Sequence, residues 1–574
     1  MSTPPIKNVA SILRLRLVVE NTIEYSWQPG PCEIPVVMAD PEHPQKPAGS
    51  AAAVNDAPPA GLMASTVVVA SMTFLSRIMG LVRDVVIARM LGASAGADAF
   101  FVALKIPNFM RRLFAEGAFN QAFVPVLSEY RTRGVSAATR LLVDRVAGSL
   151  GIVVLVISLI GVLAAPLFIS LFAPGFSDQP DKRALTIEML RLTFPYLFFI
   201  SLTAFAGGIL NSWNRFAVPA FTPVILNLSL IGCAIWLAPQ FAPDRMAVAL
   251  AWGVLLAGMA QLLFQLPFLA RLNLMPVPRM GWHDPGVKKI MRLMAPALFG
   301  ASVYQLNSLV NTVLASLLQT GSVTWLYYTD RLIELPLGIF AVAIGTVILP
   351  SLSRKHAAAS PQDFSRTLDW ALLLVLLVGV PAALALGTLA EPLLSALFHY
   401  GEFTYTDVEQ TARSLRAYSA GLLAAMLVKV LAPGFFARQD TRTPVKIGIW
   451  SMVANMVLGV SLIWHFAHVG LATAMAISAW LNAGLLYLVL RRRGVYMPQP
   501  GWWRHWVRML VAVTAMGVLT VWLADQTDVW QHGAALSRVS WLGLIVLSGV
   551  AVYGLSLLLL GLRPRHLRRV QLGD

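Results

Sequence analysis

Long apolar stretches separated by short polar connections dominate this chain from residue 63 to residue 562. An α-helix needs about 20 mostly apolar residues to cross a lipid bilayer, and these stretches are of that length. They predict an all-α polytopic membrane protein with about fourteen membrane-spanning helices. The predicted spans are residues 63–90, 97–125, 141–173, 186–213, 219–239, 246–270, 289–318, 323–352, 367–388, 409–437, 444–466, 469–490, 504–524 and 539–562.

The first two predicted spans carry charged side chains inside their apolar stretches. A charge at the centre of a bilayer costs about 2.5–3.5 kcal/mol, so such residues usually face a polar cavity and serve function. At about 100° per residue, one side of the first span gathers Ser76, Arg77, Gly80 and Asp84, with Arg83 at its margin. A narrow stripe on the second span gathers Asp98, Lys105, Arg112 and Glu116, with Asn108 beside it. We expect these two faces to line a cavity.

An alternative interpretation is that these charges reach the lipid headgroups along their own side chains, as Lys and Arg near helix ends do. We favour this interpretation for Lys105, Arg89 and Arg111. It fits Arg77 and Arg83 less well, because both lie inside an apolar run.

An internal repeat divides the apolar region into two halves. Three pairs of segments resemble each other at a shared offset of 225–226 residues: 165–176 with 391–403, 123–131 with 348–356, and 214–221 with 440–447. Six spans lie between the copies, so both halves insert in the same direction, as in transporters with parallel repeats and a site between their lobes. The predicted domains are a first lobe at 63–271, a second lobe at 288–493 and a pair of helices outside the repeat at 502–562.

The second span of the second lobe again has one polar side. Within about a third of the helix circumference it gathers Tyr327, Asp330, Arg331, Glu334, Gly338 and Gly345. By the repeat offset this helix is the counterpart of the one that carries Asp98, and we expect the two to face each other across the cavity. The alternative is a local ion pair of Asp330 with Arg331 near a helix end. Gly338 and Gly345 fit either hinges or sites of close helix packing.

Composition supports a membrane protein and limits its chemistry. The chain is 57% hydrophobic and 13% charged, with a mean hydropathy of +0.68. Its net charge of +16 lies mostly in short loops, which indicates membrane topology rather than nucleic-acid binding and puts both termini in the cytoplasm. Two cysteines give no disulfide framework. The sequence has neither a phosphate-binding ATPase loop nor a metal-ligand motif, and we expect no cofactor.

The two ends of the chain differ from the apolar region. Residues 1–62 are rich in Pro and Ala and lack a long apolar run, which predicts a disordered extension without a signal peptide. Met63, just before the first span, is an alternative start of translation. Residues 563–574 form a basic tail, which we expect in the cytoplasm.

Several long motifs resemble the MurJ/MviN family of bacterial lipid II flippases, which belong to the MATE-like multidrug/oligosaccharidyl-lipid/polysaccharide exporter superfamily. The resemblance covers essentially everything after residue 62 and rests on SMTFLSRIMGLVRD, ADAFFVALKIPNFMRRLFAEGAFNQAFVP, ILNSWNRFAVPAFTP, GSVTWLYYTDRLIELPLGIFAVAIGTVILPSLS, VKVLAPGFFARQDTRTPVKI and PQPGWWRHWVR. It implies a two-lobed, fourteen-helix fold in the bacterial inner membrane, with a cavity that opens to either side. The last two helices would form a groove for the lipid tail.

The resemblance also implies roles for particular residues. The cavity arginines of the family match Arg77, Arg83 and Arg331, and its other sensitive positions match Asp98, Asn108, Arg112, Glu116 and Asp330. Lipid II is an undecaprenyl diphosphate with a sugar–pentapeptide headgroup, and the planar fork of arginine suits a diphosphate. We expect the carboxylates Asp84, Asp98, Glu116 and Asp330 to hold the arginines or to form gate pairs.

Other expectations concern coupling and partners. Some family members have a sodium site in the second lobe, but here the corresponding spans offer Asn307, Asn311 and Asn455 without a carboxylate. Membrane potential acting on the charged cavity is the preferred driving force, with an ion gradient as the alternative. Expected partners are lipid II, membrane lipids and other proteins of cell-wall synthesis.

Two other functions stay open at this point. One is a flippase of the same fold with another polyprenyl-linked glycan as cargo; a cationic drug is disfavoured by the arginines. The other is a membrane enzyme acting on polyprenyl diphosphates, which would need clustered carboxylates or histidines at one membrane face, whereas the nine His residues are scattered.

Overall fold

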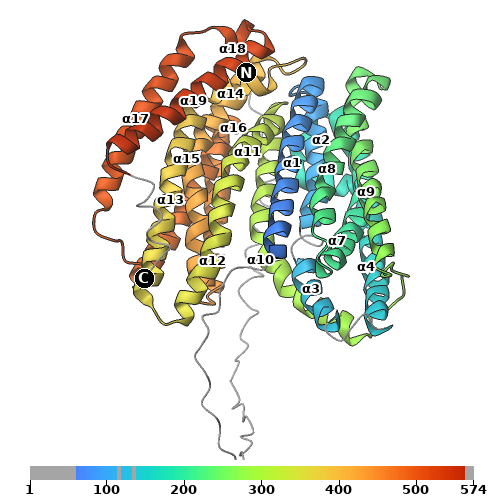
Figure 1. The fold of residues 1–574 in the computed structure, drawn as a ribbon. Helices are drawn as coiled ribbons and strands as arrows, with labels where there is room; N and C mark the ends of the chain where they lie inside the picture. Colours follow the sequence, from blue (N-terminus) through green and yellow to red (C-terminus); the bar gives the residue numbers. More distant parts are fainter. Residues whose placement is uncertain (1–59, 113–117, 132–136, 563–574) are drawn as a thin grey trace, which may run out of the picture. The chain divides into compact units, whose positions relative to one another are not determined.

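A computed structural model describes residues 60–112, 118–131 and 137–562 of the chain. The predicted extension 1–62, apart from its last three residues, and the predicted tail 563–574 lie outside these ranges, as does Glu116. Every regular element in the described ranges is a helix (Figure 1). Nine helical segments among them are long and apolar enough to cross a membrane. The all-α polytopic class predicted from the sequence is confirmed.

The predicted first lobe consists of helices that follow its apolar spans. Three of its six predicted spans, 97–125, 141–173 and 186–213, each contain two α-helices, and short turns extend the span predicted at 219–239. The elements are α1 (Ala60–Leu91), α2 (Ala95–Arg111), α3 (Ala118–Arg131), α4 (Ala137–Leu163), α5 (Ala165–Phe172), a 3₁₀ turn (Pro174–Asp178), α6 (Pro180–Thr193), α7 (Tyr196–Ser212), α8 (Ala217–Gly232), a π-helical turn (Cys233–Leu237), two 3₁₀ turns (Ala238–Gln240, Pro243–Arg245) and α9 (Met246–Arg271).

The predicted second lobe repeats this arrangement. Its helices are α10 (Pro285–Ser316), α11 (Ser322–Pro336), α12 (Val342–Ala357), α13 (Pro361–Thr388), α14 (Ala390–Phe398), α15 (Tyr405–Phe436) and α16 (Arg442–Arg492). The span predicted at 323–352 is divided by a π-helical segment, Leu337–Ala341, which begins directly after Pro336, a residue without a backbone N–H. α16 contains both predicted spans at 444–466 and 469–490, and Ala467, with φ 49°, interrupts the helical backbone between them.

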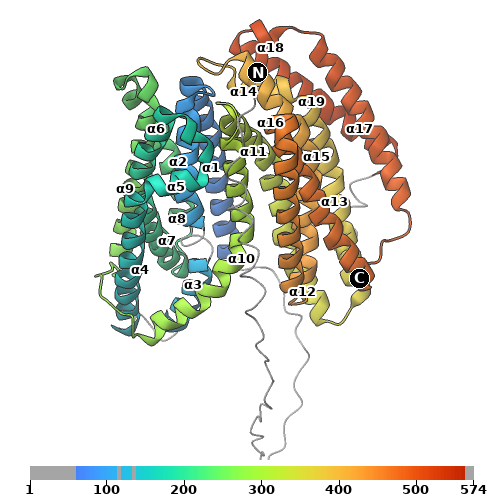
Figure 2. The same cartoon turned by 180° about the vertical axis from the view of Figure 1, so that it is seen from behind.

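The last helices form a pair beside the second lobe. α17 (Trp502–Asp525), α18 (Val529–His532) and α19 (Ala535–Leu559) follow the repeat; α17 and α19 pack on each other and contact α13 and α14 (Figures 1 and 2). Asp369 on α13 anchors the segment between α16 and α17. Its Oδ1 accepts hydrogen bonds from Tyr496 Oη (2.7 Å) and Trp502 Nε1 (2.7 Å).

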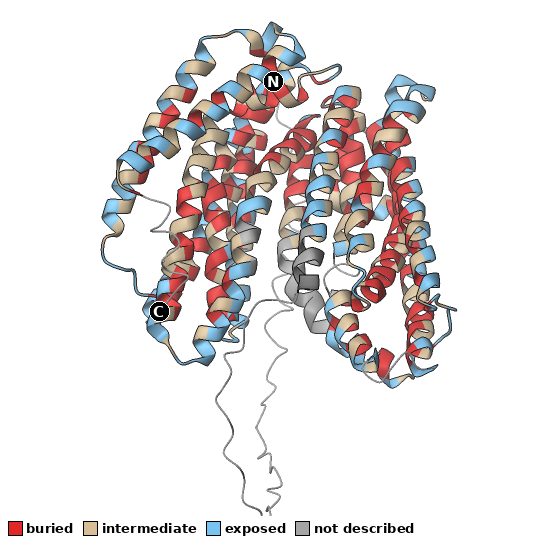
Figure 3. Cartoon of the chain, in the orientation of Figure 1, coloured by how far each residue is buried: buried red, intermediate tan, exposed pale blue. Residues whose placement is uncertain are grey.

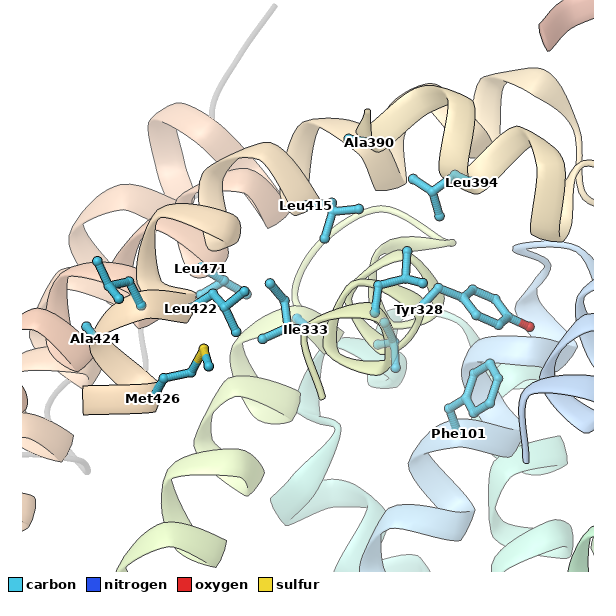
Figure 4. Close-up of a cluster of buried hydrophobic side chains, with 14 of the residues drawn as sticks. Phe101, Tyr328, Ile333, Ala390, Leu394, Leu415, Leu422, Ala424, Met426 and Leu471 are labelled. Atoms are coloured by element: carbon cyan, nitrogen blue, oxygen red, sulfur yellow. The ribbon is translucent and has the colours of Figure 1, made fainter. Parts of the chain in front are cut away.

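Two large apolar cores and a small third cluster around Trp530 hold the described helices together. The larger core contains Phe101 of α2 and Tyr328 of α11, so it crosses between the lobes (Figure 4). The smaller core lies in the first lobe, but Val287, Ile290 and Met294 of α10 belong to it. The first turns of α10 therefore pack against the first lobe, although the repeat assigns them to the second.

Many large apolar side chains of the described residues are exposed, and exposed positions occur along the outer helices (Figure 3). Leu163, Trp464 and Leu559 are 78%, 79% and 87% exposed. Such extended exposed apolar surface is typical of helices that face lipid, which agrees with the spans found by length and hydropathy.

Candidate functional site

Buried charges of α1 form the centre of the candidate site. Arg83 and Asp84 are 6% and 2% exposed. Arg83 donates to Oδ1 of Asp84 from Nε (2.9 Å) and Nη2 (2.6 Å), and its Nη1 donates to Oδ1 of Asn227 on α8 (3.1 Å). Both side chains point between the lobes, because the second lobe supplies their remaining partners.

The second lobe binds the same carboxylate through α11. Arg331 Nε lies 2.9 Å from Oδ2 of Asp84, and Tyr327 Oη donates to Oδ1 of Asp84 (3.0 Å). Arg83 Nη2 also donates to Tyr327 Oη (3.1 Å). We call Arg83, Asp84, Asn227, Tyr327 and Arg331 the central cluster. One carboxylate in this cluster faces two guanidinium groups from different lobes, so the cluster carries a net positive charge.

Arg77 lies close to this cluster along α1. A Cβ atom on Gly338 would lie 2.2 Å from its Nη1 atom, so the guanidinium packs directly on the backbone of the π-helical segment. No carboxylate of the described residues forms an ion pair with Arg77. Arg77 thus adds a further positive charge to the region where α1 meets the second lobe.

A second group of charges connects α2 with α11. Lys105 interacts electrostatically with Asp330 and Glu334, and Glu334 Oε2 lies 3.4 Å from Arg331 Nη1. Lys105 therefore lies within electrostatic range of two carboxylates of the other lobe, but no hydrogen bond or ion pair within 4 Å joins it to them among the described residues. The local pair of Asp330 with Arg331, considered as an alternative, is not what the structure contains: Arg331 binds Asp84 and Glu334 instead.

Asp98 joins the lobes at the first turn of α2. Its Oδ1 accepts from the backbone N (3.0 Å) and Oγ1 (2.7 Å) of Thr324, and its Oδ2 accepts from the backbone N of Gly321 (2.8 Å). A carboxylate in this position caps the N-terminus of α11 and complements its dipole. Asp98 and Thr324 are separated by 226 residues, the offset of the internal repeat. Equivalent points of the two lobes therefore touch here.

Lys182 of α6 completes this contact. Its Nζ donates to Oδ2 of Asp98 (2.9 Å) and to Oγ1 of Thr320 (3.3 Å), and its side chain is 3% exposed. We call Asp98, Lys182, Thr320, Gly321 and Thr324 the Asp98 junction.

Of the other predicted residues, Ser76 contacts the central cluster, whereas Asn108 and Arg112 lie apart from both groups. Ser76 contributes its backbone carbonyl, which accepts from Nδ2 of Asn227 (3.1 Å). Asn108 accepts from Nε of Arg111 (3.3 Å), and Arg112 is exposed at the end of α2. Asn108 lies ten residues, about 15 Å, along α2 from Asp98.

Two important residues were missed by sequence analysis. Asn227 is a lone amide in the apolar helix α8, and Lys182 precedes an apolar run, so each appeared to be a connection residue or a packed polar group. The isolation of Asn227 in an apolar helix is the signal that could have found it, whereas Lys182 lies between Asp181 and Arg183 and offers no such signal. Within the ranges that the structure describes, no group of three or more His, Cys, Asp or Glu residues is placed to hold a metal ion.

Asn307, Asn311 and Asn455 of the second lobe form a hydrogen-bonded group. Asn455 Nδ2 donates to Oδ1 of Asn307 (2.9 Å) and of Asn311 (2.8 Å). These amides lie in the two spans that the sequence analysis compared with the sodium site of some family members.

The chain is similar in sequence to proteins of one described family. The model of the family described as "Lipid II flippase MurJ" matches residues 87–540. A protein of Vibrio cholerae named "Probable lipid II flippase MurJ" is 49% identical over 516 residues, which cover 88% of this chain and 98% of that relative. The "Lipid II flippase MurJ" of Burkholderia cenocepacia is 40% identical over 514 residues, 88% of this chain and 99% of that relative.

Solved structures give the same fold. A structure titled "Lipid II flippase MurJ, inward closed conformation" superposes with a TM-score of 0.70 and 25% identity, covering 85% of this chain and 98% of that chain. An inward-facing multidrug transporter of the MATE family and MOP superfamily has a TM-score of 0.60 at 16% identity, covering 75% of this chain and 98% of that chain. The latter likeness concerns the fold alone.

Proposed function

The chain belongs to the MurJ family of lipid II flippases, and on this premise we propose that it moves lipid II between membrane leaflets by alternating access, with arginines between its lobes holding the diphosphate. It is a multi-pass membrane transporter and not an enzyme. Its substrate class follows from the family, whereas the residue roles below are our proposal.

One observation carries the proposal: Arg83 and Arg331, from different lobes, share the single carboxylate of Asp84. Arg77 adds a cation without a paired carboxylate among the described residues. An arriving diphosphate offers more negative charge and more acceptor oxygens than Asp84, so it can compete for the guanidinium forks. In the empty transporter Asp84 holds the arginines in place and limits the cost of their burial.

The Asp98 junction supports a gate on one side of this site. Its bonds from Asp98 to Gly321 and Thr324 cross between the lobes, while the bond to Lys182 stays within the first lobe. When the lobes separate at this end, Asp98 loses the N-terminus of α11 but keeps an opposite charge. The gate can therefore open without leaving an unpaired carboxylate.

Membrane orientation follows from the basic loops, which place both termini in the cytoplasm of the bacterial cell and the Asp98 junction at the periplasmic end. The protein would then work in the inner membrane. α17 and α19, which pack beside the second lobe, would provide the groove along which the undecaprenyl tail moves in lipid. The same headgroup chemistry fits other polyprenyl-linked glycans, so cargo identity needs a direct test.

Membrane potential is the driving force that we propose. The net positive central cluster is a charge that a potential acts on, at about 2.3 kcal/mol per elementary charge per 100 mV. No cofactor is needed for this mechanism, and the amide group of Asn307, Asn311 and Asn455 offers no carboxylate for a coupling cation.

Reconstitution of the purified full chain into proteoliposomes tests the function. We expect labelled lipid II in the inner leaflet to become accessible at the outer face only with the protein present, and faster under an imposed potential. A polyprenyl diphosphate with a different glycan serves as competitor. Equal transport of both would contradict lipid II selectivity, and no transport of either would contradict the flippase itself.

A further inference from the structure

A cavity of about 420 Å³ lies at one end of the first lobe, away from the central cluster. Its wall is formed by the first turns of α1, the turn between α7 and α8, and the last turn of α9. The lining residues include Val68, Asn214, Arg215, Phe268 and Arg271. In the predicted topology this is the cytoplasmic end of the lobe, where lipid headgroups lie.

The cavity is basic and lacks acidic lining residues. Arg215 and Arg271 are both exposed, and neither forms an ion pair with a carboxylate of the described chain. The guanidinium of Arg271 lies 5.7 Å from the ring centroid of Phe268. Two cations therefore border one hollow without an internal counter-charge.

The internal repeat provides a reference for this turn. In the first lobe Asn214 has φ 58°, and the backbone N of Arg215 donates to the carbonyl O of Leu210 (2.9 Å). In the second lobe Gln439 has φ 60°, and the backbone N of Asp440 donates to the carbonyl O of Phe435 (3.1 Å). The donor and the acceptor both shift by 225 residues, so the two turns have the same backbone and Arg215 corresponds to Asp440.

In the second lobe the acidic side chain of this turn is paired with other residues of the chain. Asp440 Oδ2 accepts from Nη1 of Arg493 (2.7 Å) and from Oγ1 of Thr443 (2.7 Å), so an ion pair bridges the turn to the end of α16. In the first lobe the acid is replaced by Arg215, and the end of α9 adds Arg271 across the cavity. The second-lobe turn therefore contains the carboxylate of Asp440, whereas the equivalent position of the first-lobe turn contains the cation Arg215.

An apolar path leads away from the cavity along the helices. Phe268 packs against Phe264 (centroids 5.5 Å apart), and Phe264 packs against Phe221 of α8 (5.5 Å). All three rings are half-buried. A soluble anion would need only the arginines, whereas a lipid also needs an apolar surface for its chains next to the headgroup site.

We propose that this cavity binds the phosphate headgroup of an anionic glycerophospholipid, with Arg215 and Arg271 holding the phosphate and an acyl chain lying along Phe268, Phe264 and Phe221. Basic pockets at the cytoplasmic ends of membrane helices have the chemistry for such headgroups. This site lies outside the transport path, and its ligand is a component of the surrounding membrane rather than the cargo.

Lipid binding to the purified, delipidated full chain tests the proposal. Native mass spectrometry with dioleoyl phosphatidylglycerol should give tighter binding than with dioleoyl phosphatidylcholine. We expect Arg215→Gln with Arg271→Gln to weaken phosphatidylglycerol binding by about tenfold or more, since hydrogen bonds to charged groups are lost. The matched control, Arg442→Gln with Arg492→Gln, removes two charges from the corresponding end of the second lobe and should change affinity by less than about threefold.

A second variant tests the same site without depending on the double substitution. Arg215→Asp places an acid at the position of Asp440, and we expect it to pair with Arg271 and to exclude the phosphate. Its phosphatidylglycerol affinity should fall at least as far as that of the glutamine pair, with an unchanged unfolding midpoint.

Four results would overturn the proposal. Equal losses in the test and control variants would indicate a general basic surface, and unchanged affinity in both Arg215 variants would show that the cavity is not the site. Displacement of the lipid by equimolar inorganic phosphate would identify a site for soluble anions. Displacement by equimolar lipid II would assign the cavity to the transport path.

Discussion

Asp84 has the central position at the scale of single residues. It accepts from Arg83 and Tyr327 and forms an ion pair with Arg331, so one buried carboxylate connects both lobes. Burial of a charge is tolerated only when partners replace water. Any change that moves α11 away from α1 must therefore provide Arg331 with another anion, and the substrate's diphosphate is an anion of suitable geometry.

Lys182 is expected to stabilise the Asp98 junction. Its side chain is 3% exposed and that of Asp98 is 1% exposed, so Lys182→Met leaves a buried carboxylate with only neutral donors. Removing one member of a buried pair costs about 3–5 kcal/mol, and we expect a loss of that size in the free energy of unfolding. Thermal or denaturant unfolding of the detergent-solubilised full chain measures it.

The double variant Lys182→Met with Asp98→Asn is the control for this prediction. Since it removes both charges, it should recover more than half of the lost stability. A Lys182→Met protein as stable as the parent chain would show that Asp98 does not depend on this lysine.

Asp440 predicts a pH dependence at the turn between α15 and α16. Hydrogen bonds from Thr443 lower the pKa of this carboxyl to about 2, with Arg493 adding to the effect. A carboxyl whose pKa is lower in the folded state stabilises the fold above its unfolded pKa of about 4, and this contribution is lost as the pH falls towards 2.

We expect Asp440→Asn to reduce the free energy of unfolding by up to about 1 kcal/mol at pH 7, the range for partly exposed pairs. The difference from the parent chain should shrink between about pH 4 and pH 2 as the parent loses its own contribution. Unfolding curves of both chains across this pH range measure it, and a difference that grows with acidification would contradict the assigned sign.

Helical phase identified the faces of residues but not their partners. The stripe with Tyr327, Asp330 and Arg331 was predicted from spacing, yet the binding of Arg331 to Asp84 could not be, because spacing within one helix contains no distance to another. Asn227 and Lys182 were missed for the same reason: each acquires its role only when a distant helix packs beside it.

At the scale of elements, the interruption of α11 determines how closely α1 approaches. Gly338 lies in the π-helical segment Leu337–Ala341, and its missing side chain makes room for the guanidinium of Arg77. The sequence left hinge and close packing as equal interpretations of this glycine. The structure favours close packing, because an added Cβ would lie 2.2 Å from Nη1 of Arg77.

Gly338→Ala is therefore expected to displace Arg77 and to reduce the rate of lipid II transport at least about tenfold, as a misplaced binding group does. Gly345→Ala is the matched control. Its Cβ would lie 3.3 Å from the carbonyl O of Lys429, a wider separation than the 2.2 Å between a Cβ at Gly338 and Arg77 Nη1. Transport in proteoliposomes at equal protein levels compares them. Equal losses in both variants would point to a hinge or to general helix packing instead.

The boundaries of elements were predictable where apolar runs end at polar residues, as at both ends of α9 and α17. The division of the span 323–352 was not, because a single Pro336 is compatible with a straight, kinked or π-helical continuation.

At the scale of the whole molecule, the two lobes are joined at the end that carries the Asp98 junction. Thr320 Oγ1 of the second lobe lies 3.4 Å from Oε1 of Gln179 in the first, near Lys182. Alternating access requires these residues to separate in each transport cycle.

A reversible crosslink between Gln179→Cys and Thr320→Cys, in a chain with Cys32 and Cys233 replaced, should stop transport, and reduction should restore it. The control pair Glu188→Cys with Arg245→Cys joins two residues of the first lobe that already form an ion pair, and its crosslink should leave transport unchanged. Undiminished transport under a verified Gln179–Thr320 crosslink would contradict opening at this end.

The repeat in the sequence anticipated two similar halves, and the equivalent contact of Asp98 with Thr324 fits it. It did not predict that the first turns of α10 pack against the first lobe. A repeat offset shows which segments correspond in sequence, but it does not show which helices are in contact.

The central claim is that Arg331 binds the diphosphate rather than merely balancing Asp84. The most direct measurement is the rate of lipid II transport by the double variant Arg331→Ala with Asp84→Ala, at verified membrane levels and beside each single variant. We expect Arg331→Ala to abolish transport and the additional removal of Asp84 not to restore it, because the diphosphate still lacks its arginine ligand. Recovery of transport in the double variant would show that Arg331 serves only as the partner of Asp84 and would contradict the account.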